Sequence, residues 1–384
     1  MKIQAYRRAN GGVGIRNHVL VIPASVCASH AACRMAEGVP GAVAIPHENG
    51  CCQVGRDHEQ TVRTLAGFGR NPNVAAVLVV SLGCEGIHFD QLQSRIEATG
   101  KPVAHVGIQA SGGETVAIQA GIRILTDLKR QADTQSRVEC DLAEIILGLE
   151  CGGSDATSGI AANPAIGVAS DLLLAAGGTS ILSETTELIG AEHLLARRAS
   201  QEVGQKIMEI VKQTEARAQA MGADLRGSQP TPGNLVGGIT TIEEKSLGCI
   251  HKAGSARVGA VIAYAEEPRG KGLIVMDTPG HDIESVTGMV AGGAQVVVFS
   301  TGLGTPTGCA ITPVIKVTGN PETFRRMADC LDVNAGRIIA EGIEIESVGR
   351  QLLDEIVAVC NGKLTRAEIS GHREFGITRI GPTF

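Results

Sequence analysis

The stretch NVAAVLVVSL, residues 73–82, is almost entirely apolar and rich in valine. A short, continuous apolar run of this kind predicts a strand that is buried on both faces, as in a parallel sheet covered by helices. Similar runs at 17–24, 41–46 and 101–108 alternate with helical patterns. Strands that alternate with helices predict an α/β fold with mainly parallel sheets.

A second series of strands and helices follows the polar segment 130–141. Its strands are predicted at 142–150, 272–277, 294–300 and 312–317. A chain of 384 residues is also long for one average domain. We therefore predict two Rossmann-like domains with mainly parallel sheets, residues 1–138 and 139–384.

The composition excludes several classes of protein. A formal net charge of -6 argues against nucleic acid or an anionic membrane as the main partner. The sequence shows no basic and apolar leader at Met1 and no apolar run that we expect to span a bilayer. Eleven cysteines in such a chain are expected to be free thiols, since disulfides are rare in a reducing compartment. We expect a cytoplasmic protein.

Three cysteines lie at or shortly after the ends of separate predicted strands: Cys51, Cys84 and Cys151. In open α/β sheets, ligands bind outside the carboxyl ends of the strands. Thiolates and imidazoles bind iron or zinc, so these cysteines and His47 form a candidate metal site. The alternative is that all three thiols are inert and buried, and the spacing alone does not decide between the two.

Two glycine-rich loops also follow predicted strands. They read CGGSDATSG (151–159) and TGLGTPTGC (301–309). Their backbone N–H groups are suited to cradle a carboxylate or phosphate. Neither loop has the P-loop or the dinucleotide pattern, so nucleotide binding is disfavoured. A capped tight turn is the competing interpretation for both loops.

Charged side chains in two other stretches are candidates for chemistry. The stretch TTIEEKSLG places Glu243, Glu244 and Lys245 on one helix, where a lysine beside carboxylates can act in proton transfer. Arg16 precedes the first buried strand and is suited to bind a carboxylate through two hydrogen bonds. The competing interpretations are a solvated helix face and a surface arginine.

Seven motifs in chain order resemble the altronate and galactarate dehydratase family. They are YRRANGGVGIRNHV, HENGC, GRNPNVAAVLVVSLGCE, CGGSDATSGIAANPAIGVASDLL, SETTELIGAEHLLARRA, PTPGNLVGGITTIEEKSLG and STGLGTPTGCAITPVIKV. The resemblance implies an enzyme that eliminates water from a sugar acid, such as an altronate-type aldonate or an aldarate, to give a 2-keto-3-deoxy acid. It also implies dependence on iron, as a ferrous ion or an iron–sulfur cluster, or on another divalent cation.

The resemblance extends to the large subunit of (2R)-sulfolactate sulfo-lyase, which is the alternative function. The HENGC and LGCE motifs match the dehydratases, whereas the ending GHREFGITRIG is similar to the sulfo-lyase. Single-chain dehydratases carry an additional SAF domain. The resemblance therefore implies the large subunit of a split enzyme, with a small SAF-domain partner and an oligomeric assembly. The alternative of another class is a non-catalytic subunit that binds sugar acids.

Roles for individual residues follow from the motifs and the resemblance together. Lys245 or Glu184 is the expected base, assisted by Glu85 or Asp155. The expected metal ligands are His47, Cys51, Cys84 and Cys151. The expected substrate-binding residues are Arg16, Asn17, Gly152, Gly153, Ser154, Asn163, Thr301 and Lys316.

Overall fold

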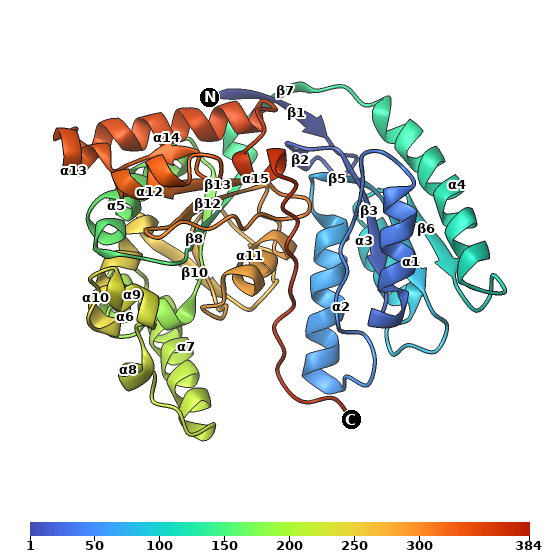
Figure 1. Cartoon of the computed structure of the whole chain (residues 1–384), viewed down its shortest axis with the longest axis horizontal. Coiled ribbons are helices and arrows are strands. Elements are labelled where there is room, and N and C mark those ends of the chain that lie inside the picture. Colours follow the sequence, from blue (N-terminus) through green and yellow to red (C-terminus); the bar gives the residue numbers. More distant parts are fainter.

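Two parallel sheets form the frame of the protein, which Figure 1 shows as a computed structural model. The structure describes residues 1–384 except for the side chain of Ser228. The first sheet has the order β4 (Ala42–Ala44), β3 (His18–Pro23), β5 (Val74–Ser81), β6 (Val103–Gly107). The second has the order β10 (Val258–Ile262), β11 (Gly272–Met276), β9 (Thr179–Leu182), β8 (Ile146–Cys151), β12 (Val296–Ser300), β13 (Val314–Thr318), β14 (Val333–Asn334). The predicted α/β fold with mainly parallel sheets is confirmed.

The four-stranded sheet is covered on both faces. Helices α1 (Val26–Glu37) and α4 (Glu114–Asp133) pack on one face, and α2 (Gly55–Arg70) and α3 (Phe89–Glu97) pack on the other. All eight residues of β5 are buried, because side chains of both faces enter a core. The apolar run at 73–82 is therefore the central strand that its composition predicts.

The seven-stranded sheet has β8 near its centre. Helices α5 (Asn163–Ala175) and α14 (Ile345–Cys360) cover one face of this region, and α11 (Asp282–Ala291) covers the other. Helix α7 (Gln201–Ala220) contributes to a further core beside β9 and β11. The remaining helices are η1 (Leu142–Glu144), η2 (Ser158–Ala162), η3 (Thr185–Leu188), α6 (Glu192–Ala196), α8 (Leu225–Ser228), α9 (Pro232–Val236), α10 (Ile242–Cys249), η4 (Ile250–Ala253), α12 (Pro321–Arg326), α13 (Arg337–Glu341) and α15 (Arg366–Ile369).

A small antiparallel sheet joins two distant parts of the chain. Its order is β2 (Val13–Gly14), β1 (Lys2–Arg7), β7 (Val138–Asp141), so that Lys2 pairs with Asp141. The sequence pattern missed β1 because its inward-facing side chains alternate with exposed ones and make no continuous apolar run. The predicted boundary at 138/139 falls within β7 and stays a prediction.

The C-terminal segment, residues 371–384, runs between α11 and α2 (red in Figure 1). Its Phe375 ring meets the Phe68 ring of α2 edge-on, with centroids 4.7 Å apart. The Gly376 N–H donates to Thr287 Oγ1 of α11 at 3.3 Å. Arg379 forms an ion pair of 3.0 Å with Asp57 of α2. The segment therefore ties a helix of the first sheet to a helix of the second.

One continuous helical segment, Ser158–Ala175, is long and apolar enough to cross a membrane by length and composition alone. The expectation of no such run is therefore corrected on that criterion. Within the fold, 56% of the segment is buried, and α5 packs closely on α14 and η4. The same test is passed by the core helix of a folded domain, and that is the place this segment has here.

Candidate active site

The two glycine-rich loops meet at the carboxyl ends of β8 and β12. Along the chain, strands are added on one side of β8 up to β11, and the chain then returns to β12 on the other side. Such a reversal of strand order leaves a crevice where ligands bind in open α/β sheets. The loops are joined by hydrogen bonds from the Gly152 N–H to the Ser300 carbonyl (3.0 Å) and from the Leu303 N–H to the Gly153 carbonyl (2.9 Å).

A fully buried polar cluster surrounds Cys151, the last residue of β8. The Cys151 thiol donates to Glu187 Oε2 at 2.6 Å, and its sulfur lies 3.4 Å from that of Cys249 on α10. Lys252 Nζ donates to the Cys151 sulfur at 2.8 Å and to Glu184 Oε2 at 2.6 Å. The side chain of Lys252 is only 1% exposed. The lysine is therefore the central cation of this cluster.

Lys245 connects the cluster to its surroundings. Its Nζ lies 2.8 Å from Glu187 Oε1, so Glu187 lies between two ammonium groups. Burial alone would raise the pKa of Glu187, but Lys245 and Lys252 outweigh it and hold that pKa below its usual range. Glu187 is therefore an ionised carboxylate in the interior.

The positive charge near Glu184 does not offset the effect of its burial, in contrast to Glu187. Burial and the charge of Glu187 raise the pKa of Glu184 to about 7, against the opposing charge of Lys252. Its backbone has a φ of 67°, which is unusual for a residue with a side chain, and its N–H donates to Thr278 Oγ1 at 2.7 Å. Its Oε2 also accepts from the Cys151 N–H at 2.9 Å. The strained turn thus fixes Glu184 against the end of β8.

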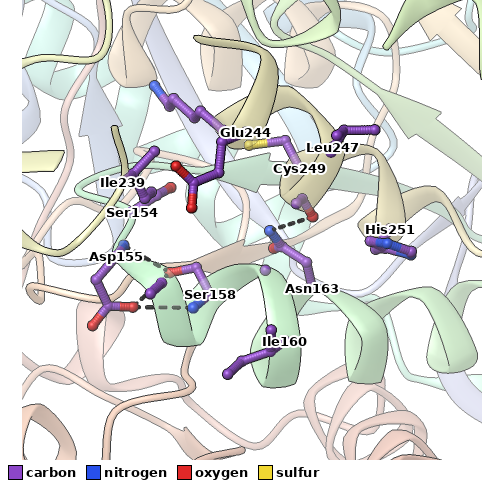
Figure 2. Close-up of a pocket in the computed structure, with 14 residues that line it drawn as sticks. Ser154, Asp155, Ser158, Ile160, Asn163, Ile239, Glu244, Leu247, Cys249 and His251 are labelled. Carbon is purple, nitrogen blue, oxygen red and sulfur yellow. Dashed lines mark hydrogen bonds between the residues drawn. The ribbon is translucent and has the colours of Figure 1, made fainter. Parts of the chain in front are cut away.

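A pocket of about 310 Å³ opens beside the cluster, and Lys245 and Cys249 belong to both. Figure 2 shows that its labelled residues come from the loop after β8, from η2 and the start of α5, and from the segment that runs from the end of α9 through α10 into η4. The lining residues are Ser154, Asp155, Ala156, Ser158, Gly159, Ile160, Asn163, Ile239, Glu244, Lys245, Leu247, Gly248, Cys249 and His251. The Ser154 hydroxyl is buried and has no hydrogen-bond partner in the structure. The volume suits a small molecule.

Among the described residues, two sets of three side chains could each hold a metal ion. Within each set, the ligand atoms lie within 4.8 Å of one another. One consists of Cys151, Glu187 and Cys249, and the other of Glu150, Glu184 and Asp282. Lys252 already contacts the first set, to which the predicted ligand Cys151 belongs. In the second set, Glu150 Oε1 and Glu184 Oε1 are buried without any hydrogen-bond partner. Unpaired buried oxygens of this kind are available to a cation.

The structure does not bring the four predicted metal ligands together. No three of His47, Cys51, Cys84 and Cys151 have ligand atoms within 4.8 Å of one another in the described part of the chain. Cys51 and Cys84 are exposed, whereas Cys151 is buried. Both ring nitrogens of His47 contact backbone, at the Pro23 carbonyl and the Asn49 N–H. Their joint role as ligands stays a prediction.

The predicted residues Arg16 and Asn17 contact protein groups rather than the pocket. Arg16 binds both oxygens of Glu368 at 2.7 and 2.8 Å and also donates to three backbone carbonyls. Asn17 donates to the Ala132 carbonyl at 2.7 Å. Glu85 accepts from the Gly83 N–H at 2.6 Å, in a loop of the first sheet.

The other predicted residues lie at the two glycine-rich loops. Asp155 caps the following turn, because its Oδ1 accepts from the Ser158 N–H at 3.0 Å. Lys316 Nζ donates to the Thr307 carbonyl at 2.9 Å, and Thr301 Oγ1 accepts from the Gly304 N–H at 3.0 Å, so both residues hold the second loop. Asn163 lines the pocket and donates to the Gly248 carbonyl at 3.0 Å. Gly152, Gly153 and Ser154 form the first loop.

Sequence reasoning missed Glu187, Cys249 and Lys252. One signal was present for the latter two. Lys245, Cys249 and Lys252 have the spacing of one helical face, and their helix α10 continues directly into η4. Nothing local distinguishes Glu187 from a surface residue of a short helix, because its partners Cys151 and Lys252 are 36 and 65 residues away in sequence.

Comparisons with known proteins agree on one family. The family model described as "D-galactarate/Altronate dehydratase, C-terminal" matches residues 142–383. The model described as "D-galactarate dehydratase/Altronate hydrolase, second domain" matches residues 5–133.

Curated relatives align with nearly the whole chain. The (2R)-sulfolactate sulfo-lyase subunit beta of Chromohalobacter salexigens is 41% identical over 378 residues, which cover 98% of this chain and 96% of that protein. The altronate dehydratase of Bacillus subtilis is 34% identical over 99% of this chain and 78% of its own length. The altronate dehydratase of Escherichia coli is 36% identical over 100% and 78%. The first of these relatives is named as a subunit, which suggests an enzyme of more than one subunit.

Proposed function

Because the chain belongs to the D-galactarate/altronate dehydratase family, we propose that it eliminates water from an altronate-type sugar acid and gives a 2-keto-3-deoxy acid. Membership makes the chain an enzyme of the hydro-lyase type, which disfavours the non-catalytic alternative. The observation that carries the proposal is the pocket of about 310 Å³ whose wall contains a carboxylate and an ammonium group side by side, Glu244 and Lys245. Elimination beside a carboxylate requires both a base and a cation.

Glu244 is the proposed base. Figure 2 shows its carboxylate inside the ring of pocket residues. The N–H and the hydroxyl of Thr240 donate to Glu244 Oε2 at 2.8 and 2.7 Å, and they lower the pKa of this carboxylate. The group is therefore ionised at neutral pH, and its Oε1 is left to accept the proton next to the substrate carboxylate.

Lys245 is the proposed acid. Burial would lower its pKa, but the carboxylate of Glu187 and the two thiols of the cluster raise the pKa of Lys245 above its usual range. The lysine therefore carries its proton at neutral pH. It is suited to stabilise the negative charge that develops on the substrate and to protonate the leaving hydroxyl, rather than to act as the base that the sequence suggested.

The test is a pair of substitutions at neighbouring positions. Glu244→Gln removes the proposed base, and we expect kcat to fall by about 10²- to 10⁴-fold. Glu243→Gln is the matched control, because Glu243 binds Arg226 at 2.7 Å and does not line the pocket. Equal turnover in the two variants would remove Glu244 from the mechanism.

The carboxylates Glu150, Glu184 and Asp282 fit the divalent cation that the family implies. Burial raises the pKa of Glu150 well above its usual value, and it also raises the pKa of Asp282. Three crowded carboxylates with two unpartnered oxygens provide oxygen ligands, which Mg²⁺, Mn²⁺ and Fe²⁺ accept. When bound, such a cation supplies Lewis-acid stabilisation of the enediolate. The iron–sulfur cluster on His47, Cys51, Cys84 and Cys151 stays the competing proposal.

Metal binding can be measured without turnover. Chelator-treated protein is titrated with Mn²⁺, and free Mn²⁺ is followed by its paramagnetic resonance signal. Asp282→Asn is expected to weaken binding at least tenfold. Glu284→Gln changes the same charge on the same helix outside the set, and it should leave the affinity unchanged. Unchanged affinity in Asp282→Asn would place the cation elsewhere.

Elimination of sulfite from sulfolactate is the second candidate function. It is favoured by the sulfo-lyase subunit, which is 41% identical and matches over 96% of its own length. Aldonates, aldarates and sulfolactate are therefore offered to the same preparation. Release of a 2-keto-3-deoxy acid supports the first function, and release of sulfite supports the second.

A small SAF-domain subunit is the proposed partner, and the pocket mouth is its proposed position. Ile160 and Leu247 line the pocket and are 61% and 46% exposed, and the neighbouring α9 exposes Leu235 and Val236. Co-expression with the small subunit should give a complex that Ile160→Asp weakens. All eleven cysteines are free, which agrees with the proposed cytoplasmic location.

A further inference from the structure

Cys51 and Cys52 are adjacent in sequence and also in space. Their sulfur atoms lie 3.7 Å apart, which is a non-bonded contact, and both residues are exposed. Neighbouring side chains on an extended backbone point to opposite sides, so two successive cysteines do not ordinarily touch. The sequence assigns no role to Cys52, and the elimination reaction does not use it.

An unusual backbone conformation at Cys52 accounts for the contact. Its φ is 56°, a left-handed value that residues with side chains rarely adopt. The loop maintains it through hydrogen bonds from the Gly50 N–H to Gln53 Oε1 (2.8 Å) and from the Gly86 N–H to the Gly50 carbonyl (3.1 Å). A strained conformation that several neighbours maintain indicates a function for the geometry.

We propose that Cys51 and Cys52 form a site of reversible oxidation, at which a peroxide converts the two thiols into a disulfide between neighbouring residues. One thiol is oxidised by hydrogen peroxide to a sulfenic acid, and one water leaves. The second sulfur then attacks the first, the S–S bond forms, and a second water leaves. The two sulfurs lose two electrons in total, and the peroxide gains them. A dithiol reductant reverses the step by thiol–disulfide exchange.

The other cysteines lack one of the two requirements. Cys27 and Cys84 are exposed, but no sulfur lies within hydrogen-bond distance of theirs among the described residues. Cys151 and Cys249 are closer together, at 3.4 Å, but both are buried, and peroxide cannot reach them without local opening. Exposure together with a resolving thiol is what favours a disulfide over further oxidation. Cys51 and Cys52 alone combine them in the described part of the chain.

The disulfide would also act on the C-terminal segment. The Cys52 carbonyl accepts a hydrogen bond of 3.0 Å from the Phe384 N–H. A disulfide requires the sulfurs to approach to about 2.05 Å, which rotates the peptide between them. Two residues of the same network, Gln53 and Ile380, bind the two oxygens of Asp57 at 2.7 Å each. Oxidation is therefore expected to release the last residues of the segment that ties α2 to α11.

The test uses the reduced full-length protein and hydrogen peroxide. Samples are alkylated after different times, digested and analysed by mass spectrometry, with and without later reduction by dithiothreitol. The peptide that contains Cys51 and Cys52 should become lighter by two hydrogens and resist alkylation, and dithiothreitol should restore it. Cys27 and Cys84 should oxidise at least tenfold more slowly. Sulfinic or sulfonic acid at Cys51 without the lighter peptide, or equal rates at all exposed cysteines, would overturn the proposal.

Two further measurements use the matched variant Cys52→Gly, in which glycine takes the left-handed backbone without strain. This variant should fold, keep the basal activity and form no intrapeptide disulfide. In the unsubstituted protein, oxidation should speed hydrogen exchange at the Phe384 and Ile380 amides, and in Cys52→Gly it should not. Exchange that is the same before and after disulfide formation would overturn the link to the C-terminal segment.

Discussion

Two pairs of cysteines in this protein have nearly the same spacing and opposite environments. Cys51 and Cys52 lie 3.7 Å apart on an exposed loop, and Cys151 and Cys249 lie 3.4 Å apart in the interior. Lys252 and Glu187 contact the buried pair, whereas no charged side chain is hydrogen-bonded to the sulfurs of the exposed pair among the described residues. Spacing alone therefore does not define a thiol site; burial and charged partners decide whether the sulfur is structural, catalytic or open to oxidation.

The largest effect should follow the loss of the buried cation. Lys252→Met leaves Glu184 and Glu187 in the interior without this partner, and we expect the free energy of unfolding to fall by about 3–5 kcal/mol. Turnover should be lost as well, because Glu184 and Cys151 lose the group that orients them. Urea unfolding and an activity assay measure the two effects.

Lys206→Met is the control, because it removes only an exposed ion pair with Glu202. Its free energy of unfolding in urea should equal that of the unsubstituted protein. A stable Lys252→Met would contradict the role given to this lysine.

A smaller effect should follow from a single methyl group at the end of β8. A Cβ atom at Gly152 would lie 2.2 Å from Asp282 Oδ2, so Gly152→Ala must displace that carboxylate. We expect a cost of about 1–3 kcal/mol in stability and weaker Mn²⁺ binding. Gly270→Ala is the matched control, since nothing lies within 4 Å of its Cβ position. Mn²⁺ affinity that Gly152→Ala leaves intact would argue against the carboxylate site.

The smallest effect concerns a buried thiol away from the pocket. Burial raises the pKa of the Cys360 thiol to about 12, against the charges of Arg16 and Arg137. At a pH between the ordinary thiol pKa of 9.0 and this raised pKa, Cys360 has lost its proton in the unfolded chain and keeps it in the folded chain. Stability should therefore fall as pH rises through this window, by about 1.4 kcal/mol per pH unit from this group. Urea unfolding at pH 8.5 and 10 should show a smaller decrease for Cys360→Ala. An equal decrease in both proteins would contradict the raised pKa.

The sequence was sufficient for most of the fold. The continuous apolar run at 73–82 and the alternation around it predicted buried parallel strands, which β5 and its neighbours are. The strand β1 was not predicted, because a strand with only one buried face has no continuous apolar run. The two glycine-rich loops were predicted either to cradle an anion or to form capped turns after strands. They meet at the carboxyl ends of β8 and β12, and anion binding by them stays a prediction.

The sequence was insufficient for the arrangement of the site. His47, Cys51 and Cys84 follow strands of the four-stranded sheet, whereas Cys151 ends a strand of the seven-stranded sheet. The carboxyl ends of parallel strands lie at the same edge only when the strands belong to one sheet. That each of these residues follows a strand therefore did not imply that their side chains lie close together. Lys252 has the spacing of one helical face with Lys245 and Cys249, but this pattern does not reveal its burial. A buried lysine looks like a surface lysine until its carboxylate partners, here Glu184 and Glu187, are placed.

The central claim is that elimination takes place at the pocket of the seven-stranded sheet. The most direct test compares turnover of Lys245→Met and Cys84→Ser in one metal-replete, anaerobic preparation with the small subunit present. The account predicts that Lys245→Met loses at least a hundredfold in kcat and that Cys84→Ser keeps more than half of it. Full activity in Lys245→Met together with loss of activity and metal in Cys84→Ser would contradict the account and move the centre to the exposed thiols of the first sheet.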